Sequence, residues 1–365
     1  MLSLNEAYLL LISIPNVCSS DIYKLEKFID LRHILDIKNE YILNIKNINT
    51  NIKENIVQYK SKSYLGEVKE NLIKNKVSYV SINDDLYPKN LKNIYEPPKI
   101  LFFRGDISIL NNGLNITMVG ARKCSTYGKY CAENFSRELS KVGVNILSGL
   151  AMGIDSYSHE ACIGNKGKTV AVIASSVDNI TPKISICLGE KILNDGGCIL
   201  SEYYIGSNVY PHNFVKRNRI LSGISDGVLV VEASQKSGSL ITVDFALEQG
   251  KNIFCIPGNI NSITSQGCNN IIKEGAKLTT NLDDILQEYN HIKFEFEEKK
   301  KFDKIKLNDY SQKIINIIKQ KGVSNIDEIC ETTKLSIKIV NSNINELILN
   351  DLIIEMDNKN YSLNI

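Results

Sequence analysis

Between residues 77 and 258, short apolar runs alternate with longer helical segments, and this alternation leaves few folds open to the chain. Each run is rich in β-branched or aromatic residues, and most end in glycine or a small residue. Continuously apolar strands separated by helices are typical of a parallel sheet covered on both faces, so we predict an α/β fold. The predicted strands are VSYVSI (77–82), ILFFRG (100–105), ITMVG (116–120), NILSG (145–149), TVAVIA (169–174), CILSE (198–202), GVLVVEA (227–233) and NIFCIPG (252–258).

The two ends of the chain follow other patterns. Residues 1–70 place apolar residues three and four positions apart on both sides of the turn PNVCSS (15–20), which predicts a helical domain. Residues 291–309 are a run of mixed charge and predict a solvated linker. Residues 310–365 predict three helices followed by two short strands, which is the winged-helix pattern. The α/β domain is then expected to span 71–290.

Composition narrows the class of function. The 365 residues carry a net charge of +2 and 43% hydrophobic side chains, which favours a packed core without an overall positive charge. Any contact with nucleic acid must therefore come from a local basic patch. The nine cysteines form no CxxC pair, which predicts free thiols in a reducing compartment. Cys, His, Asp and Glu do not cluster at ligand spacings, so no metal site is expected.

The chain is expected to be cytoplasmic. Its apolar run at 7–14 ends at Pro15, far short of the ~20 residues that a membrane helix needs. No basic segment precedes this run, so a signal peptide is not expected.

Glycine-rich turns follow three of the apolar runs, in GARKCSTYG (120–128), SGLAMGID (148–155) and SGSLIT (237–242). Backbone N–H groups at such turns and at helix starts hold phosphates. Neither a Walker A loop nor GxGxxG is present, so no nucleotide cofactor is expected. The candidate phosphate contacts are Arg122, Ser148, Gly149, Ser237, Gly238 and Ser239.

The segment FVKRNR (214–219) is the strongest basic feature. Phe214 is suited to stacking on an unpaired base, and the next residues are suited to the DNA backbone. This pattern predicts binding of single-stranded DNA. The structural alternative is a helix start with one exposed basic face and Phe214 in the core. The candidate contacts are Phe214, Lys216, Arg217, Asn218 and Arg219.

Two further features have structural alternatives. Arg122 is placed to contact DNA, but an arginine after a strand also pairs with carboxylates at the end of a sheet. Asp155 and His159 lie four residues apart on one predicted helix face, where the carboxylate could orient the imidazole as in catalytic sites. Because no nucleophile with a local signature accompanies them, we interpret them as a structural pair. No catalytic residue is predicted, and the protein is not expected to be an enzyme.

Seven motifs occur in one order and together resemble the DNA-processing protein A family (DprA, also called Smf). The resemblance covers roughly residues 75–290 well and the two ends more loosely. The motifs are GARKCSTYG, SGLAMGID, FVKRNR, VVEA (230–233), SGSLIT, IPG (256–258) and SQGCNNIIKEGA (265–276).

The resemblance implies an extended Rossmann-like core with an N-terminal helical domain similar to sterile-alpha-motif (SAM) domains. It implies that Arg122 contacts single-stranded DNA. It also implies that the protein protects incoming strands during natural transformation, delivers them to the RecA recombinase and forms a homodimer through the Rossmann domain. Met152 stands where the family usually has arginine, which removes one positive contact.

A second interpretation is a nucleotide-binding enzyme or sensor, similar to the nucleoside-monophosphate phosphoribohydrolases. Glu232, Asp244 or Glu248 would then act as acid or base on a ribosyl bond. The PGGxGT loop of those enzymes is replaced here by SGSLIT. This difference favours the DNA-binding interpretation.

Overall fold

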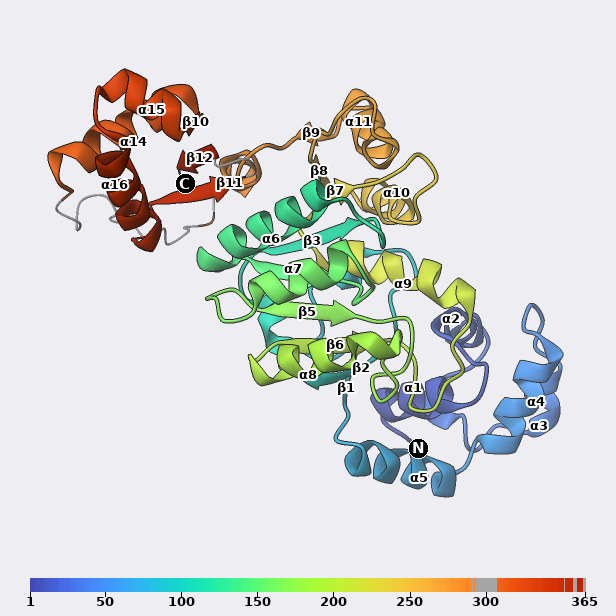
Figure 1. The fold of residues 1–365 in the computed structure, drawn as a ribbon. Coiled ribbons are helices and arrows are strands. Elements are labelled where there is room, and N and C mark those ends of the chain that lie inside the picture. Colours follow the sequence, from blue (N-terminus) through green and yellow to red (C-terminus); the bar gives the residue numbers. More distant parts are fainter. Residues whose placement is uncertain (290–291, 293–306, 351, 357–359, 364–365) are drawn as a thin grey trace. The chain divides into compact units, whose positions relative to one another are not determined.

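The computed structural model describes residues 1–289, 292, 307–350, 352–356 and 360–363. The chain divides into two compact units, Met1–Glu295 and Phe296–Ile365 (Figure 1). Most of the predicted linker lies outside the described residues, and the domain boundaries proposed from the sequence stay predictions.

The first unit begins with helices, as the apolar spacing predicts. Ser3 caps the first helix and, with Glu6, forms a reciprocal capping box, which explains why the helix begins there. Buried residues of these helices share one core with the sheet residues Ile100, Phe102 and Ile199. The helix α5 continues past the predicted boundary at residue 70. The elements are α1 (Leu4–Ser13), α2 (Ser19–Glu26), η1 (Leu31–His33), α3 (Asn39–Leu43), α4 (Thr50–Tyr59) and α5 (Lys62–Lys74).

A nine-stranded sheet forms the centre of this unit, in the order β1-β2-β6-β5-β4-β3-β7-β8-β9. All eight predicted strands are present, and β9 is a two-residue strand that no apolar run announces. The strands are β1 (Ser78–Ser81), β2 (Ile100–Gly105), β3 (Asn115–Gly120), β4 (Asn145–Ser148), β5 (Thr169–Val172), β6 (Cys198–Ser201), β7 (Gly227–Glu232), β8 (Asn252–Cys255) and β9 (Lys277–Leu278).

The strands from β3 to β9 pair in parallel, which confirms the predicted α/β fold with a mostly parallel sheet. The strands β1 and β2 differ, because β1 pairs antiparallel with β2 and β2 pairs antiparallel with β6. Only a short 3-10 helix, η2 (Asn90–Asn93), lies between β1 and β2, whereas parallel neighbours usually need a crossover helix.

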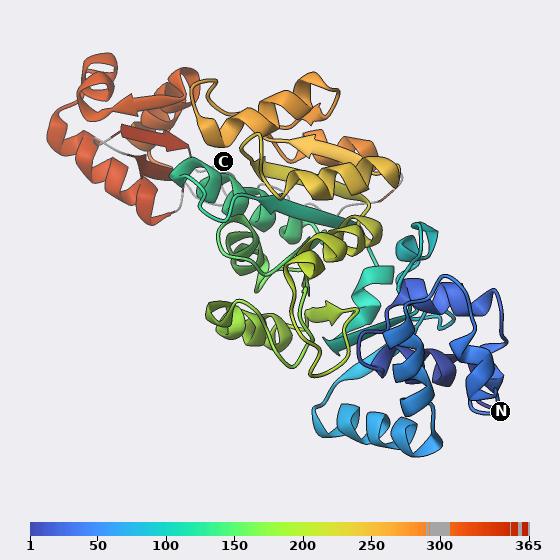
Figure 2. The same ribbon diagram turned by 90° about the vertical axis from the view of Figure 1, so that its right-hand side faces the viewer.

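Helices cover both faces of the parallel strands (Figure 2). Ile146 of β4 packs with α6 and α7 on one face, while its neighbour Leu147 packs with α9 on the other. This alternation explains why the strands are apolar without interruption. The remaining elements are α6 (Thr126–Lys141), α7 (Ile154–Cys162), α8 (Ile186–Asn194), α9 (Pro211–Ile224), α10 (Leu240–Glu248), α11 (Gln266–Lys273), α12 (Asp283–Leu286), η3 (Ile107–Asn111), η4 (Lys183–Ser185), η5 (Ile263–Ser265) and η6 (Gln287–Tyr289).

The second unit has its own apolar core, which includes Ile314, Ile329 and Leu347. The predicted three helices and two strands are present, and a third short strand follows the first helix. The strands pair antiparallel in the order β10-β12-β11. The winged-helix assignment stays a prediction. The elements are α14 (Asp309–Lys321), β10 (Val323–Asn325), α15 (Ile326–Thr333), α16 (Ile337–Leu349), β11 (Ile353–Met356) and β12 (Asn360–Leu363).

All nine cysteines are free. Within the described ranges, no helix has the length and apolar character needed to cross a membrane, and no cluster of three or more His, Cys, Asp or Glu residues is placed to hold a metal ion.

Candidate functional site

The strand order reverses between β3 and β7. From β3 the sheet continues through β4, β5 and β6 on one side and through β7, β8 and β9 on the other. Ligands of open α/β sheets bind beyond the carboxyl ends of the strands at such a point. Here Gly120 of β3 pairs with Glu232 of β7, and the N–H of Ala121 donates to the carbonyl of Glu232 at 2.8 Å. Arg122 therefore begins the loop at the switch point.

A carboxylate of the chain itself occupies the start of α6. Glu232 is buried and accepts hydrogen bonds from the N–H of Ser125 (2.8 Å) and the hydroxyl of Thr264 (2.6 Å). The hydroxyl of Ser125 accepts from the N–H of Gly128 at 3.0 Å, so the predicted helix cap is confirmed. A Cβ at Gly128 would collide with the Glu232 carboxylate. Since anions favour helix N-termini, Glu232 takes the position that a phosphate would need.

Arg122 and Phe214 lie together beside this point. The guanidinium carbon of Arg122 is 5.8 Å from the centre of the Phe214 ring, within the range of a cation–π contact. Arg122 is exposed and Phe214 is half-buried, so both remain accessible from outside. Among the described residues Arg122 makes no ion pair with a carboxylate, in contrast to the structural alternative. The fold thus joins a cation and an aromatic ring from the loop after β3 and from α9.

Lys216 lies two residues after Phe214, on the opposite side of α9. Its side chain is exposed and makes no hydrogen bond or ion pair with any other described residue. Of the three cations in FVKRNR, Lys216 is the one without a hydrogen-bond or ion-pair partner in the described part of the chain. Arg217 and Arg219 of the same segment both point elsewhere.

Arg217 was predicted to contact a DNA phosphate, but in the structure it is buried. It is 6% exposed, and its Nη1 donates to the carbonyl of Gly149 (2.9 Å) and to the carbonyl of Val172. Its Nε donates to Asn218 Oδ1 at 3.3 Å, so Asn218 holds the guanidinium in place. Burial, partly offset by Asp155, lowers the pKa of Arg217 to about 10, so the group stays charged at neutral pH. Arg217 therefore supports the loop between β4 and α7 from inside.

Gly149 is required by this arrangement, because a Cβ there would collide with the guanidinium of Arg217. Its N–H donates to Asp155 Oδ2 at 3.0 Å. The hydroxyl of Ser148 is buried and donates to the carbonyl of Met118 at 2.7 Å. Ser148 and Gly149, both predicted phosphate contacts, are thus engaged within the protein.

Arg219 also has a partner within the protein. Its Nη2 lies 2.5 Å from Glu202 Oε2, and its Nη1 donates to the carbonyl of Glu96 at 3.2 Å. Glu202 directly follows β6, so this is an arginine paired with a carboxylate at the end of the sheet. Pairing with a carboxylate at the end of the sheet was the structural alternative predicted for Arg122. In the structure Arg219 makes this pair instead.

The predicted pairing of Asp155 with His159 is wrong. Asp155 accepts hydrogen bonds from the N–H groups of Gly149 and Ala151. His159 is fully buried, and its Nδ1 lies 2.6 Å from the hydroxyl of Thr169. Burial lowers the pKa of His159 to about 3 and raises that of Asp155 above its usual value. Asp155 holds the loop after β4 and His159 contacts Thr169 of β5, so the structural role is kept while the pairing is not.

The turn before α10 carries the remaining predicted contacts. The hydroxyls of Ser237 and Ser239 lie 2.7 Å apart, and the helix begins at Leu240. Gly238 is exposed, with open space around its Cα. Ser237, Gly238 and Ser239 are thus half-buried or exposed on a separate turn.

A model of the family described as DNA recombination-mediator protein A matches residues 78–290. The chain belongs to this family. DNA processing protein DprA of Streptococcus pneumoniae is 43% identical to it over 209 residues, which cover 57% of this chain and 73% of the relative.

Two solved structures of DprA proteins have the same fold. The X-ray structure of the Streptococcus pneumoniae protein matches with a TM-score of 0.67 and 35% identity, and it covers 81% of this chain and all of that one. The Helicobacter pylori protein matches with a TM-score of 0.53 and 28% identity, over 60% of this chain and 98% of that one. The Helicobacter structure was reported for its single-stranded DNA binding mode. The resemblance inferred from the seven motifs is confirmed.

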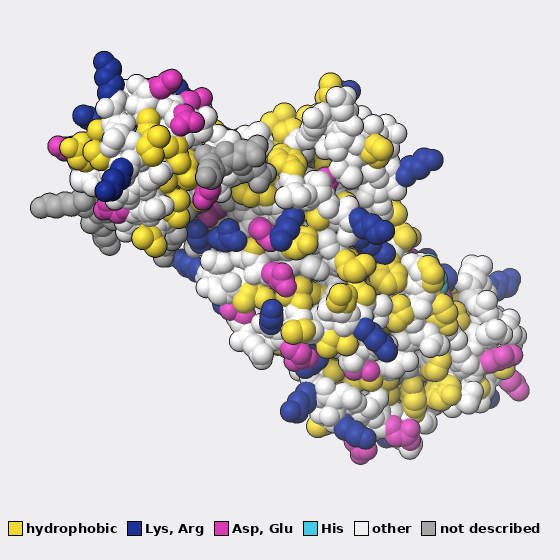
Figure 3. Space-filling view, viewed as in Figure 1, with side chains coloured by type: hydrophobic (Ala, Val, Ile, Leu, Met, Phe, Trp, Pro, Cys, Tyr) yellow, Lys and Arg dark blue, Asp and Glu magenta, His cyan; other side chains and the backbone are white. Residues whose placement is uncertain are grey.

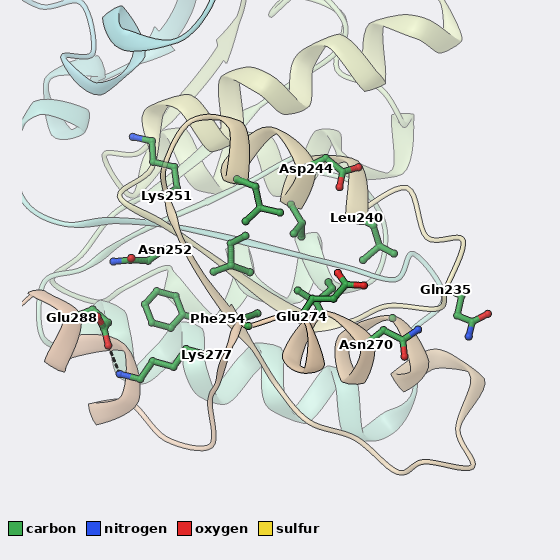
Figure 4. Close-up of a pocket in the computed structure, with 17 residues that line it drawn as sticks. Gln235, Leu240, Asp244, Lys251, Asn252, Phe254, Asn270, Glu274, Lys277 and Glu288 are labelled. Carbon is green, nitrogen blue, oxygen red and sulfur yellow. Dashed lines mark hydrogen bonds and ion pairs between the residues drawn. The ribbon is translucent and has the colours of Figure 1, made fainter.

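In this chain, the residues proposed for the rival enzyme do not meet. Asp244 and Glu248 lie on the exposed side of α10, while Glu232 is buried at the start of α6. Asp244 lines a hollow of about 510 Å³ that is formed by β8, α10 and α11. Lys277 and Glu288 form an ion pair at its rim (Figure 4). None of the predicted DNA contacts lines that hollow.

The surface agrees with the nearly neutral composition of the chain. On the face drawn in Figure 3, Lys and Arg side chains are scattered among Asp and Glu and form no continuous basic field. Binding of a polyanion by this chain must then depend on a few basic groups in fixed positions. Two carboxylates shape the site in ways that the sequence pattern did not predict: Glu202 pairs with Arg219, and Glu232 occupies the start of α6. Both come directly at the end of a predicted strand, which was the available signal.

Proposed function

We propose that the chain binds single-stranded DNA at Arg122, Phe214 and Lys216. The observation that carries the proposal is the contact of Arg122 with Phe214 at the switch point of the sheet. An aromatic ring flanked by cations suits single strands, because unpaired bases expose their faces for stacking while the cations attract phosphates. Bases in a duplex offer no such face to a single ring. The Helicobacter pylori relative, studied as a single-stranded DNA binder, supports the same substrate.

The other predicted contacts have different parts in this proposal. Ser237, Gly238 and Ser239 form an outer anion contact that a strand leaving Arg122 reaches. Arg217 and Arg219 act from inside the protein, by fixing the loop after β4 and the loop after β6. They position the interface, and they do not touch the phosphates.

The biological role proposed is protection of incoming single strands during natural transformation and their delivery to the RecA recombinase in the cytoplasm. Membership of a family described as recombination mediators supports this role. It is tested by following RecA-dependent strand pairing with and without the protein. An Arg122→Ala variant should fail to stimulate pairing, and equal stimulation by this variant would contradict the role.

A homodimer through the Rossmann domain is part of the same proposal. Leu247 on α10 (62% exposed) and Leu278 on the edge strand β9 (48% exposed) are two apolar side chains suited to burial between copies. Light scattering should give twice the monomer mass, and Leu247→Glu should reduce it to that of the monomer. A monomeric wild-type protein would contradict the dimer.

We further propose that the protein is not an enzyme. Glu232 receives its two hydrogen bonds from within the fold, which leaves it unsuited to acid or base catalysis on a nucleotide. Incubation with AMP, ATP and labelled DNA should give no products. Release of adenine from AMP, abolished by Glu232→Gln, would favour the nucleotide-hydrolase alternative.

A further inference from the structure

A second hollow of about 830 Å³ lies within the first unit, next to the proposed DNA contacts. Its walls are the turn 15–20 between α1 and α2, the loop 202–208 after β6, and the first two turns of α9. Lys216 lines it, although on α9 this residue lies on the opposite side of the helix from Phe214. The hollow thus shares Lys216 with the proposed interface and lies across α9 from Phe214, and its size is that of a ligand site.

Aromatic rings are concentrated at this hollow. Tyr210 and His212 form a nearly parallel ring pair, with centroids 5.4 Å apart and planes 7° apart. Tyr210 is 44% exposed, and Tyr95 on the opposite wall is 86% exposed. Exposed rings of this kind are platforms on which unpaired bases stack.

Two residues that line the hollow carry a buried polar atom without a hydrogen-bond partner among the described residues. Glu202 is 9% exposed; its Oε2 binds Arg219, but its Oε1 is buried and has no hydrogen-bond partner in the described structure. The buried hydroxyl of Tyr203 is likewise without a partner there. Buried polar atoms are nearly always paired, so these two point to a ligand with complementary groups.

The charges decide which part of a DNA strand fits. Glu96 and the ion pair of Glu202 with Arg219 line the hollow and offer a phosphate no unpaired cation, whereas a carboxylate oxygen accepts readily from the exocyclic amine of a base. Lys216 at the rim attracts the backbone. A strand would thus enter with its bases inward and its phosphates outward.

We propose that a single strand held at Arg122 and Phe214 continues past Lys216 into this hollow. There its bases stack on Tyr210 and His212, and an amine-bearing base such as cytosine donates to Glu202. This inference rests on the proposed function and adds a second contact region between the N-terminal helices and α9. It also adds a preference for amine-bearing bases over thymine.

The test compares labelled oligo-dC and oligo-dT of about 4 and about 12 nucleotides by fluorescence anisotropy. The variants are Tyr210→Ala with His212→Ala, the single Tyr95→Ala, and Tyr130→Ala as the control. Tyr130 is 58% exposed on α6 and does not line the hollow. Thermal melting of each variant shows whether the fold is kept. Tyr95→Ala removes a side chain that is almost wholly in solvent, so it tests the hollow even if the double variant unfolds.

We expect the 12-mers to bind the wild type about tenfold more tightly than the 4-mers, and oligo-dC more tightly than oligo-dT only at the greater length. The double variant should lose both gains while it binds the 4-mers normally. Tyr95→Ala should lose part of the tighter binding of 12-mers over 4-mers. Tyr130→Ala should keep both this difference and the preference for oligo-dC.

Unchanged 12-mer binding in both hollow variants, or equal binding of dC and dT 12-mers by the wild type, would overturn the inference while the proposed function stands. Binding of an oligolysine peptide that the double variant loses, with 12-mer binding intact, would assign the hollow to a basic peptide and overturn it as well. Failure of the wild type to bind any oligonucleotide would instead remove the proposed function.

Discussion

The guanidinium of Arg122, in the loop after β3, lies 5.8 Å from the ring centre of Phe214 on α9. The two residues come from distant parts of the chain, and the strand order places them together at the switch point. A base that stacks on Phe214 would therefore meet the cation that attracts its phosphate. This relationship links the fold to the proposed function.

Phe214→Ala should weaken binding of single-stranded DNA by about 1–3 kcal/mol, or roughly 5- to 150-fold, because one stacking surface is lost. Binding is measured by titrating a labelled oligonucleotide. Since Phe214 is half-buried, urea unfolding of the same variant separates lost stacking from lost stability. Unchanged affinity would assign the ring to the core alone.

Lys216→Ala should lower both the affinity and its dependence on salt. A single phosphate contact on a single strand contributes about 0.7 to the slope of log affinity against log salt concentration. Lys191→Ala is the matched control, because Lys191 is an exposed lysine on α8 away from the interface. Parallel salt plots for the wild type and Lys216→Ala would show that Lys216 makes no phosphate contact.

Arg217→Met should destabilise the fold by roughly 2–5 kcal/mol, because the buried carbonyls of Gly149 and Val172 lose their charged donor. Arg122→Ala, at an exposed site, should change stability by less than about 0.5 kcal/mol. Urea midpoints distinguish the two arginines. Equal stability of Arg217→Met and the wild type would contradict the structural role of Arg217 and favour the predicted contact with DNA.

His159 should make the protein sensitive to acid. Burial, with a smaller effect of Arg217, lowers its pKa to about 3, so the folded imidazole is neutral while the unfolded one binds a proton below pH 6.5. Its stabilising contribution is complete above pH 6.5 and falls as the pH decreases toward 3, by up to about 1.4 kcal/mol per pH unit.

The raised pKa of Asp155 acts in the opposite direction, since its contribution is present below about pH 3.8 and is lost as the pH rises through the raised value. The measurement is therefore a difference between the wild type and His159→Asn in unfolding free energy from pH 7 to 4. The variant should show the smaller loss on acidification. Parallel curves would mean that His159 does not titrate on unfolding.

The strands and the switch-point loop could be predicted from the sequence, because buried parallel strands are apolar runs that end at glycines. The two-residue strand β9 could not, since Lys277 and Leu278 carry no such signal. Arg217 illustrates a missed signal. Asn213, Arg217, Ile220 and Ile224 recur at helical spacing and are all buried on α9, so the position of Arg217 on an apolar stripe was visible.

The partner of Arg219 could not be predicted from the sequence. Glu202 meets it only because β6 and α9 are brought together by the strand order, which local patterns do not encode. The same holds for the hollow beside Tyr210, since one of its walls is the distant turn 15–20. Long-range packing decides which members of a basic cluster face solvent.

The most direct test of the proposed interface is the affinity of the wild type and of Arg122→Ala for a labelled oligo-dT and for the same length of duplex, at moderate salt. Arg137→Ala is the control, because Arg137 is exposed on α6 away from the switch point. The wild type and the control should bind the single strand more tightly than the duplex, and Arg122→Ala should lose most of the binding with its melting temperature unchanged. Equal affinity of the wild type for single strand and duplex, or normal binding by Arg122→Ala, would contradict the account.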